Sequence, residues 1–326
     1  MKQVVGIDVS KAKLDCLWLR EPNALKVKTK VIANTAEGHI ALIEWLNATL
    51  ACTPEQVLIV MEATGVYHEA AAYTLHEAGF NIAVINPAQL KHYRRGLGQL
   101  HKTDKQDSLA IARYGATQPI TRWQPEAVEV RQLKALLARL DALETDRQRE
   151  RNRLEKATVS ASSDVVIESI RKILHHLDTE IKRLQQQIDD HIQRHPQLKK
   201  DRQLLESIPG VGPVLSRLML SVIHSRSFEH AHQVAAYLGV IPVLTESGIF
   251  KGRSRLSKKG PARIRAKLYM PAVVASRYNH QIMAQKARLL AKGKTTMQAL
   301  GAAMRKLVHL CFGVIKNQTE YSPLIA

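Results

Sequence analysis

The order of apolar segments in the first 61 residues constrains the fold of this chain more than any other feature. Three short apolar or alternating runs, at 4–9, 14–19 and 27–33, are separated by polar breaks, which is typical of antiparallel strands joined by tight turns. A helical pattern from residue 36 to about 50 follows them. The continuous apolar run at 57–61 predicts a strand that is buried on both faces, so we expect a layered domain of helices and strands.

A second helix and a fifth strand at 81–85 complete this first, α/β part of the chain. Three strands followed by helix, strand, helix and strand predict a mixed sheet flanked by helices, and the ribonuclease-H-like fold has that order. The segment from 105 to about 117 has a helical pattern, and Pro119 and Pro125 interrupt the chain after it. We therefore expect the first domain to span residues 1–125.

The middle of the chain carries a coiled-coil pattern. Apolar residues recur there at alternating steps of three and four, and a weaker pattern of the same kind precedes them at 133–143. Two long helices in an antiparallel hairpin, with the turn at 160–164, explain both patterns. The hairpin is either an arm within one protomer or a seam between protomers, and we favour a homo-oligomer, a dimer or a tetramer. The stronger pattern consists of Ile167, Ile170, Leu174, Leu177, Ile181, Leu184 and Ile188.

Positive charge is concentrated toward the carboxyl end. The chain has 48 Lys and Arg residues against 29 Asp and Glu residues, a net charge of +19. Residues 249–326 hold 16 of the basic residues and one acidic residue, Glu320, whereas residues 1–110 are nearly neutral. Because apolar helical stretches such as 299–315 interrupt the cations, we expect a folded basic domain rather than a solubility tail or a membrane-surface contact. Such a domain indicates a polyanion as partner, with nucleic acid as the first candidate and salt-dependent binding.

Cysteine usage and hydropathy favour a cytoplasmic protein. The three cysteines, Cys16, Cys52 and Cys311, lack metal-ligand spacing, and their odd number argues against a disulfide framework. Asp8 falls where a signal peptide would need an apolar run, and no segment has the length of a membrane span. We therefore expect a soluble protein with no membrane partner.

Four acidic residues stand at positions where an enzyme of this fold would use them. Asp8 ends the first predicted strand and Glu62 ends the buried one, and ligand sites gather at such strand ends. Asp104 and Asp107 begin the next predicted helix, where a spacing of three places both on one helix face. Each acid alone has an ordinary explanation as a turn residue, a helix-dipole partner or an N-cap. An aspartate like Asp8 also opens the actin-like and sugar-kinase ATPases, but no convincing glycine-rich adenosine-binding loop follows here.

Taken together, the four acids predict a metal site. Phosphoryl transfer with two Mg²⁺ ions needs several hard oxygen ligands that converge on metals about 3.5–4 Å apart. In a ribonuclease-H-like sheet the first and fourth strands are neighbours, and a following helix can bring its acids over them. We predict that Asp8, Glu62, Asp104 and Asp107 are metal ligands and catalytic residues, with Mg²⁺ as the metal and Mn²⁺ as its substitute.

A glycine-rich turn, Ile208-Pro209-Gly210-Val211-Gly212, joins two helical patterns after Pro196. Two glycines that flank one apolar residue suit a helix-hairpin-helix, because they permit a sharp turn and leave backbone N–H groups at a helix start to face a phosphate. A plain helix–helix turn is the alternative. The basic segment that follows favours contact of Gly210 and Gly212 with a nucleic-acid backbone.

Five short motifs follow one another along the chain: GIDVSK at 6–11, EATG at 62–65, INP at 85–87, KTD at 102–104 with Asp107, and SIPGVG at 207–212. In this order they resemble the bacterial insertion-sequence transposases that have a DEDD acidic tetrad and a RuvC-like N-terminal domain, which are related to the Piv DNA invertases. The resemblance covers nearly the whole chain. It implies a protein of the bacterial cytoplasm that associates with the nucleoid.

The resemblance implies a further catalytic residue and further partners. It places the nucleophilic serine of the family's C-terminal domain on Ser247, which would attack a DNA phosphate and form a covalent phosphoserine intermediate. Composition and spacing alone do not select Ser247 over Ser254 or Ser257. The resemblance also implies a structured non-coding RNA, the bridge RNA, that pairs with donor and target DNA. Base pairing would then select the DNA sequence, while the protein would recognise the backbone and the shape of the nucleic acid.

The rest of the chain divides, on this interpretation, into a coiled-coil arm at 126–200 and a mostly helical, basic transposase domain at 201–326. The basic domain contains the glycine-rich turn, the candidate nucleophile and most of the excess positive charge. Besides the two glycines, the residues that we predict to contact nucleic acid are Lys251, Arg253, Arg255, Lys258, Lys259 and Arg263.

These features predict a transposase or site-specific DNA recombinase that exchanges strands through the acidic tetrad and Ser247. One alternative is a RuvC-like nuclease or Holliday-junction resolvase that cuts with water and uses no serine. An alanine at position 247 separates these two hypotheses. The other alternative is a non-enzymatic nucleic-acid-binding scaffold, for which an alanine in place of Asp104 would leave function intact.

Overall fold

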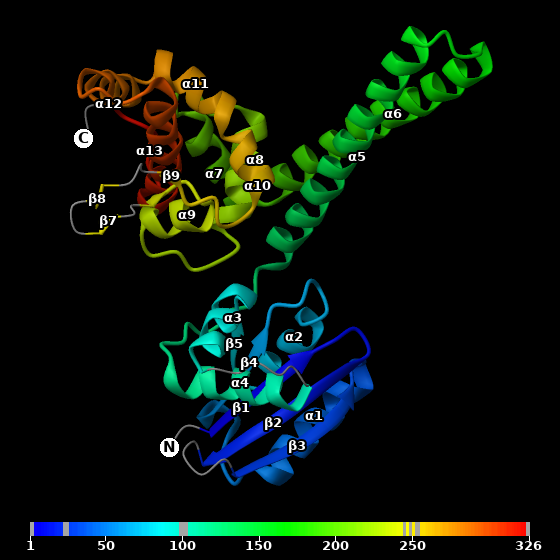
Figure 1. Ribbon diagram of the computed structural model, residues 1–326, viewed down its shortest axis with the longest axis vertical. Coiled ribbons are helices and arrows are strands. Elements are labelled where there is room, and N and C mark those ends of the chain that lie inside the picture. Colours follow the sequence, from blue (N-terminus) through cyan, green and yellow to red (C-terminus); the bar gives the residue numbers. More distant parts are fainter. Residues whose placement is uncertain are drawn as a thin grey trace. The chain divides into compact units, whose positions relative to one another are not determined.

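A computed structural model of the chain divides into two units, residues 1–125 and 126–326, and each has its own apolar core (Figure 1). The boundary that we predict near residue 200 lies within the second unit and stays a prediction. No helix in the described part of the chain is long and apolar enough to cross a membrane. The structure describes residues 3–21, 26–97, 104–243, 246–247, 250–251 and 255–323.

A five-stranded sheet forms the centre of the first unit. Its strands are β1 (Gln3–Val9), β2 (Lys13–Glu21), β3 (Lys26–Ala33), β4 (Val57–Glu62), preceded by the 3-10 turn η1 (Pro54–Gln56), and β5 (Asn81–Ile85). The strand order is β3-β2-β1-β4-β5. The pairs β1–β2 and β2–β3 are antiparallel, whereas β1–β4 and β4–β5 are parallel. The predicted mixed sheet with a ribonuclease-H-like strand order is confirmed.

One face of this sheet is covered by α1 (Ala36–Thr49) and α2 (Glu69–Glu77). Leu46 of α1 and Leu75 of α2 are fully buried and pack in one cluster with Ile59 of β4. Because side chains alternate between the two faces of a strand, the residues on either side of Ile59 project to the opposite face. The alternation therefore separates the core beneath α1 and α2 from the face that carries the candidate site.

The opposite face is covered by α4 (Asp104–Thr117). Ile111 of this helix is fully buried in a cluster with Val60 of β4. The helix also crosses β1 at Gly6, where a Cβ atom would lie 2.3 Å from the backbone oxygen of Ser108. The absence of a side chain at Gly6 thus allows backbone-to-backbone contact between helix and strand.

The INP motif builds the start of α3 (Pro87–Gly96), which follows β5. The side chain of Asn86 caps the helix by accepting a hydrogen bond of 2.8 Å from a backbone N–H of its first turn. Tyr93 of α3 packs edge-on against Tyr114 of α4, with ring centroids 5.2 Å apart. α3 and α4 therefore form a packed pair beside the sheet.

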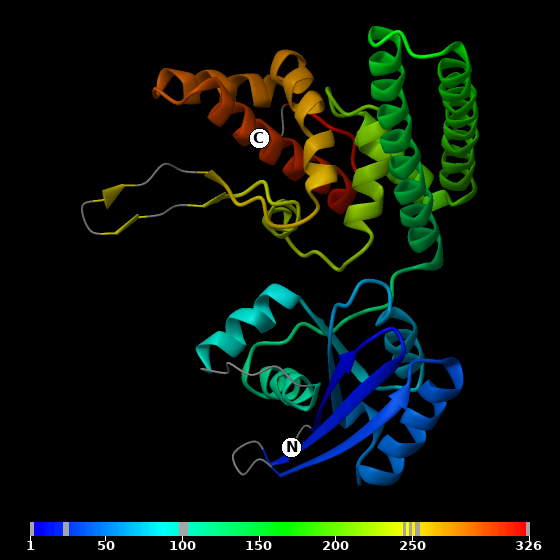
Figure 2. The same ribbon diagram turned by 45° about the vertical axis from the view of Figure 1, so that its right-hand side comes forward.

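Two long helices, α5 (Val128–Val159) and α6 (Asp164–Arg194), begin the second unit and lie side by side in both views (Figures 1 and 2). Leu143 of α5 and Ile181 of α6 belong to the same buried cluster. The predicted helical pair and its turn at 160–164 are confirmed. The part of the predicted seam nearest the end of α6, which comprises Ile181, Leu184 and Ile188, packs within a single chain.

Several of the remaining helices of the second unit pack against α13 (Thr296–Asn317), whose Leu307 and Cys311 are fully buried. Burial raises the pKa of the Cys311 thiol to about 12, so this side chain stays protonated and acts as an apolar residue of the core. The other helices are α7 (Pro196–Glu206), α8 (Pro213–Ile223), α9 (Ala231–Tyr237), α10 (Ala262–Lys267), α11 (Tyr269–Tyr278) and α12 (His280–Ala291).

Four two-residue strands lie between α9 and α10. β6 (Pro242–Val243) pairs antiparallel with β9 (Arg255–Leu256), and β7 (Glu246–Ser247) pairs antiparallel with β8 (Phe250–Lys251). Figure 2 shows both pairs in yellow, one beyond the other along the same extension. Strands of two residues have no periodicity that could be recognised, which is why the sequence analysis did not predict this extension.

Candidate active site

Asp8 and Glu62 lie on neighbouring strands at the same end of the sheet. The parallel register of β1 and β4 places them side by side, one residue beyond the last paired positions. Each stands two residues after a position that contacts α4, Gly6 on β1 and Val60 on β4. Since side chains two apart on a strand share a face, both carboxylates are on the face that α4 covers.

Helix α4 adds a third carboxylate to this face. Asp107 is one helical turn before Ala110 and Ile111, which pack on the sheet, so the three share one side of the helix. Asp107 itself is buried. The next residue, Ser108, donates a hydrogen bond of 2.9 Å from Oγ to the backbone oxygen of Asp15 on β2. This bond fixes the first turn of α4 over the strands that carry the other acids.

Asp104, the fourth predicted acid, is the first residue of α4 and lies one turn before Asp107. The helical spacing that we predict for these two residues is therefore present. The side chain of Asp104 lies outside the described part of the chain. Its role as a ligand stays a prediction.

A fifth carboxylate, which the sequence analysis missed, faces the first. Asp15 of β2 is the register partner of Asp8 in the antiparallel pair, and directly opposed residues project to the same face. The Nζ atom of Lys13 lies 3.1 Å from Oδ2 of Asp15 and balances its charge. In the sequence, Asp15 is the polar member of an alternating strand. Only the register of β1 and β2 shows that it lies beside the site.

Asn34 connects the loops that follow the two acidic strands. Its Nδ2 atom donates to the backbone oxygens of Ser10, at 2.9 Å, and of Tyr67, at 3.0 Å. Its Oδ1 atom lies 2.8 Å from Nε2 of His39. Burial lowers the pKa of His39, so at neutral pH the ring is uncharged and can donate this bond from Nε2. A single side chain thereby holds the loop after β1 against the loop after β4.

The donor chemistry of the site suits a divalent metal, since carboxylate oxygens are the hard ligands that Mg²⁺ prefers. Asp107 already forms an ion pair with a cation, the guanidinium of Arg94 on α3. Within the described residues, however, no three acidic, histidine or cysteine side chains are close enough to hold a metal ion. The structure therefore brings Asp8, Glu62 and Asp107 to one face and one end of the sheet without closing them into a coordination sphere.

In the second unit, the glycine-rich turn connects α7 and α8. Gly210 has a φ of +101°, and a Cβ atom there would lie 2.7 Å from the Cβ of Ala275, so both conformation and space require glycine. Gly212 directly precedes Pro213, the first residue of α8, and no atom lies within 4 Å of a Cβ built on it. The turn has the geometry that we predict. Its contact with nucleic acid stays a prediction.

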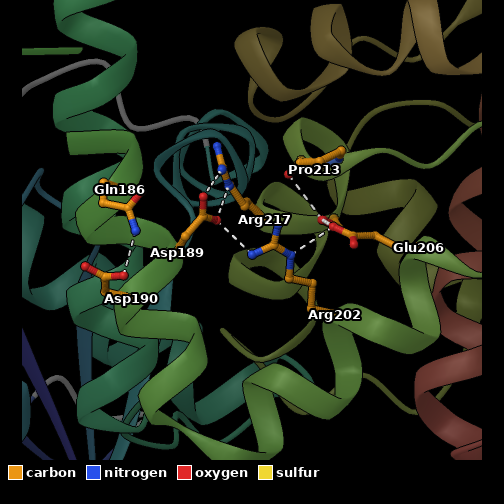
Figure 3. A network of polar contacts seen from close by, with 8 residues as sticks. Gln186, Asp189, Asp190, Arg202, Glu206, Pro213 and Arg217 are labelled. Carbon is orange, nitrogen blue, oxygen red and sulfur yellow. Dashed lines mark hydrogen bonds and ion pairs between the residues drawn. The ribbon is translucent and has the colours of Figure 1, made fainter. Parts of the chain in front are cut away.

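Ion pairs fix the helices of this turn against the arm (Figure 3). Arg217 of α8 donates to both carboxylate oxygens of Asp189 on α6, at 3.0 and 2.5 Å. Arg202 of α7 lies 2.7 Å from the same aspartate and 2.9 Å from Glu206. A two-pronged guanidinium–carboxylate pair is both stronger and more directional than a single bond. The network therefore sets how α6, α7 and α8 meet.

Ser247, the candidate nucleophile, lies on β7 opposite Phe250 of β8, and its side chain is exposed. Arg253 and the residues that flank the two short strands, 244–245 and 248–249, lie outside the described part of the chain. The role of Ser247 stays a prediction.

The predicted nucleic-acid contacts differ in their surroundings. Arg255, Lys258 and Lys259 have exposed side chains, whereas the side chain of Lys251 lies outside the described part. Arg263 of α10 forms an ion pair with Asp141 of α5 and donates to Thr145 Oγ1 at 3.0 Å. Arg263 therefore also contributes to contact between the arm and α10. The role of these residues in nucleic-acid binding stays a prediction.

The fold and the acids define a class: a DEDD-type enzyme of DNA phosphoryl transfer, with acids on one face of a mixed sheet followed by a helical arm and a basic helical region. Residues 5–160 match the family model of DEDD transposases of the IS110 type, and residues 202–287 match that of the transposase IS116/IS110/IS902 family. The chain belongs to the IS110 family of DEDD transposases. The predicted family, fold class and enzyme class are confirmed.

Similar proteins include both an invertase and a transposase. The chain is 32% identical over 328 residues to the pilin gene-inverting protein of Moraxella bovis, across 99% of each chain. It is 25% identical over 235 residues to the transposase for insertion sequence element IS1111A of Coxiella burnetii, across 64% of this chain and 63% of that one. A solved structure of T. thermophilus RuvC with a Holliday junction substrate matches 38% of this chain at 18% identity and a TM-score of 0.27.

Proposed function

We propose that this transposase exchanges DNA strands by Mg²⁺-dependent phosphoryl transfer at the acidic site, with Ser247 as the nucleophile. One observation carries the metal-dependent part: Asp8 of β1 and Glu62 of β4 lie on the sheet face that α4 covers, and Asp107 lies on the side of α4 that packs on that face. Each acid alone has an ordinary structural explanation. Three on one face at one end of the sheet are better explained by a common ligand.

Asp8, Glu62, Asp104 and Asp107 would hold the metal. When bound, Mg²⁺ supplies Lewis acidity for the phosphate oxygens and the attacking hydroxyl, and Mn²⁺ can take its place. The other residues of the chain contribute by holding these carboxylates in position. Ser108 anchors the turn of α4 that carries Asp107, and the Asn34 bridge holds the two loops after the acidic strands together.

The resemblance to serine-using members of the family supports the covalent step. A bond forms between Ser247 Oγ and a DNA phosphorus while one phosphorus–oxygen ester bond of the backbone breaks. The serine proton passes to a base or to water, and the departing sugar oxygen takes up a proton. In the second step a sugar hydroxyl of the other strand attacks the phosphoserine, so Ser247 regains its proton and the strands are joined.

We further propose that a structured bridge RNA pairs with donor and target DNA, as the family resemblance implies. The basic excess of the second unit supports binding of a second polyanion beside DNA. Sequencing the RNA that copurifies with the protein tests this. A single structured species encoded next to the gene supports the proposal, and recovery of ribosomal and transfer RNA alone contradicts it.

The homo-oligomer that we propose is supported by the outer part of the arm. Val159, Val165 and Ile173 are 83%, 78% and 46% exposed, although they are apolar and close to the α5–α6 turn. Lysine in place of both Val165 and Ile173 should shift the molar mass in light scattering toward the protomer. Arg171→Lys, at an exposed position of the same helix, is the control, because it leaves the charge of the arm unchanged. An unchanged mass for the Val165/Ile173 variant would place the seam elsewhere.

The central experiment uses a supercoiled plasmid that carries the insertion element with its own flanks. Asp8→Asn, Glu62→Gln and Asp107→Asn should lower cleavage by about 10²-fold or more while DNA binding is kept. Glu155→Gln, at an exposed position of the arm, is the control. Ser247→Ala should abolish the covalent protein–DNA product on a denaturing gel. Normal cutting and rejoining by Ser247→Ala would favour the water-using nuclease, and full activity of the acid variants would favour the scaffold.

A further inference from the structure

A pocket of about 610 Å³ lies in the second unit between α12, α13 and the strands at the base of the β6–β9 extension. Leu256 of β9, Leu289 of α12 and Met297 of α13 form an apolar part of its wall. Gly301 of α13 also lines it. The volume is in the range of sites that enclose a small organic molecule or one nucleotide, about 300–1,000 Å³.

The same pocket is strongly basic. Arg255, Lys294, Arg305 and Lys306 all line it, and no acidic side chain that the structure describes does. Among the residues that the structure describes, none of these four cations has an acidic partner. Four uncompensated positive charges around one pocket attract an anionic ligand.

Three buried polar atoms in the pocket wall have no hydrogen-bond partner in the described chain: Arg305 Nε, His309 Nε2 and Gln285 Oε1. A buried polar atom without a partner typically costs about 1–3 kcal/mol, so such atoms are rare and seldom cluster. Burial first, and then the charges of Arg305, Lys306 and His232, lower the pKa of His309. Its uncharged ring can donate or accept at Nε2. The wall thus offers donors and an acceptor to a ligand.

We propose that this pocket binds one unpaired nucleotide of a nucleic-acid strand. The apolar wall of Leu256, Leu289 and Met297 suits the faces of a base, and the amide of Gln285 suits its hydrogen-bonding edge. The cations of α13 suit the phosphate. Unpaired bases are bound in other proteins by this combination of an apolar surface and a cationic groove.

Other occupants explain fewer of these features. A duplex backbone needs cations on an open surface, and it gives no reason for an apolar cavity or for the buried acceptor of Gln285. A free phosphate would satisfy the cations and leave most of the volume empty. An acidic peptide remains as an outcome of the test.

This inference rests on the proposed function, because strand exchange is what exposes unpaired nucleotides to this enzyme. It also goes beyond the predicted contacts, because Arg255 is the only one of their described side chains that lines the pocket. Arg305, Lys306 and His309 belong to a helix whose pattern is otherwise that of a buried core element. These three residues line one pocket only because α13 packs beside α12 and β9.

The test uses full-length protein with Asp8→Asn, so that binding is measured without cleavage. Fluorescence anisotropy is recorded with four labelled probes of one sequence: single-stranded DNA, single-stranded RNA, duplex DNA and a single-stranded DNA whose sugars are abasic. Arg305→Gln with Lys306→Gln removes two pocket cations. Arg288→Gln with Lys292→Gln is the charge-matched control, since both residues are exposed on or beside α12 and neither lines the pocket.

The pocket variant should bind the preferred single strand at least about tenfold more weakly than the control variant does. Its salt dependence should also fall by about 0.7 in the slope of log K against log salt, the change expected for the one phosphate that the variant no longer neutralises. Duplex binding should be equal in the two variants, and the abasic strand should bind the unaltered pocket about tenfold more weakly than the native strand. Whichever single-stranded probe, DNA or RNA, binds more tightly identifies the kind of strand that supplies the nucleotide.

Several results would overturn the inference. Equal single-strand affinity of pocket and control variants would exclude the pocket, and an abasic strand that binds as well as the native one would reduce it to a phosphate site. Loss of binding to a polyglutamate peptide without loss of strand binding would assign it to a protein partner. If circular dichroism shows that the Arg305→Gln/Lys306→Gln variant is unfolded, His309→Ala replaces it as the pocket variant in the same binding measurements. None of these outcomes bears on the acidic site, which is tested by cleavage.

Discussion

Arg94 of α3 and Asp107 of α4 form an ion pair in which both side chains are largely withdrawn from solvent, 17% and 8% exposed. A guanidinium and a divalent metal need the same carboxylate oxygens. Removal of one partner from a buried ion pair is costly, because the other charge is left uncompensated. The pair therefore stabilises Asp107 when no metal is bound, and a metal that binds at Oδ1 of Asp107 competes with Arg94 for that oxygen.

Arg94→Ala should increase the apparent affinity for Mg²⁺. Without metal the variant should be less stable than the unaltered protein, because Asp107 lacks a counter-charge. With metal this difference should shrink, and the Mg²⁺ concentration for half-maximal thermal stabilisation should fall about tenfold, which corresponds to about 1.4 kcal/mol. Arg95→Ala is the control, since Arg95 is exposed on the same helix. A higher Mg²⁺ requirement for Arg94→Ala would show that Arg94 supports the metal rather than competes with it.

Gly6→Ala tests whether contact between α4 and β1 positions the acids. The added methyl group would lie 2.3 Å from the backbone oxygen of Ser108 and 2.5 Å from the backbone nitrogen of Ala112, so the helix must move. Overpacking of this kind costs about 1–3 kcal/mol. A displaced α4 also carries Asp107 away from Asp8. We expect a lower unfolding temperature together with loss of cleavage.

The control for Gly6→Ala is Gly96→Ala, at the last position of α3, where no atom lies within 4 Å of the new methyl group. It should leave stability and cleavage unchanged. If Gly6→Ala cleaves DNA at the normal rate at a temperature where it is folded, the position of α4 over β1 does not matter for the acidic site.

The parts of the fold that follow from hydrophobic periodicity could be predicted from the sequence. The run at 57–61 is apolar at every position because the strand is buried on both faces, beneath α1 and α2 on one side and α4 on the other. The seam of α6 repeats at heptad spacing because it packs along α5. Asp8 and Glu62 were recognisable for the same reason, as the first polar residues after buried strands.

What could not be predicted depends on contacts between distant segments. Asp15 faces Asp8 only through the register of β1 and β2, and Arg94 meets Asp107 only because α3 packs on α4. Neither of these two contacts corresponds to a residue spacing that could be recognised in the sequence. The strands around Ser247 are held by a few backbone pairs rather than by a core, so they have no apolar pattern.

Asn34→Asp isolates the bridge between the two loops. The substitution keeps the oxygen that faces His39 but replaces the donor that bonds to Ser10 and Tyr67 with a second acceptor. The loss of two partly exposed hydrogen bonds should lower the free energy of unfolding by about 1 kcal/mol. Cleavage should fall about tenfold with DNA affinity unchanged, because the ends of β1 and β4 are no longer held together.

Asn47→Asp, at an exposed position of α1, introduces the same charge and should have little effect. The result to look for is a change in the Mg²⁺ dependence of cleavage. A variant that is less stable yet needs no more Mg²⁺ than the unaltered protein would assign Asn34 a purely structural role.

Asp201 of α7 supplies a pH-dependent prediction for the second unit. Its carboxylate is fully buried and accepts hydrogen bonds from Gln197, at 3.0 Å, from Gln318, at 2.7 Å, and from the His224 ring, at 2.8 Å. Burial alone would raise the pKa of Asp201, but the bonds from His224, Gln318 and Gln197 together outweigh it and lower the pKa below 3.8. The folded protein therefore favours the ionised form more than the unfolded chain does.

A carboxyl group whose pKa is lower in the folded state contributes stability above its unfolded pKa and loses it as the pH falls through the folded value. Asp201→Asn should therefore lower the free energy of unfolding by about 1–3 kcal/mol at neutral pH. The difference from the unaltered protein should narrow as the pH falls below 3.8, and urea unfolding followed by circular dichroism over a pH series measures it. Asp190→Asn, at an exposed position of α6, should show no such trend. A difference that stays constant down to the lowest pH would mean that packing, and not the ionised carboxylate, makes Asp201 important.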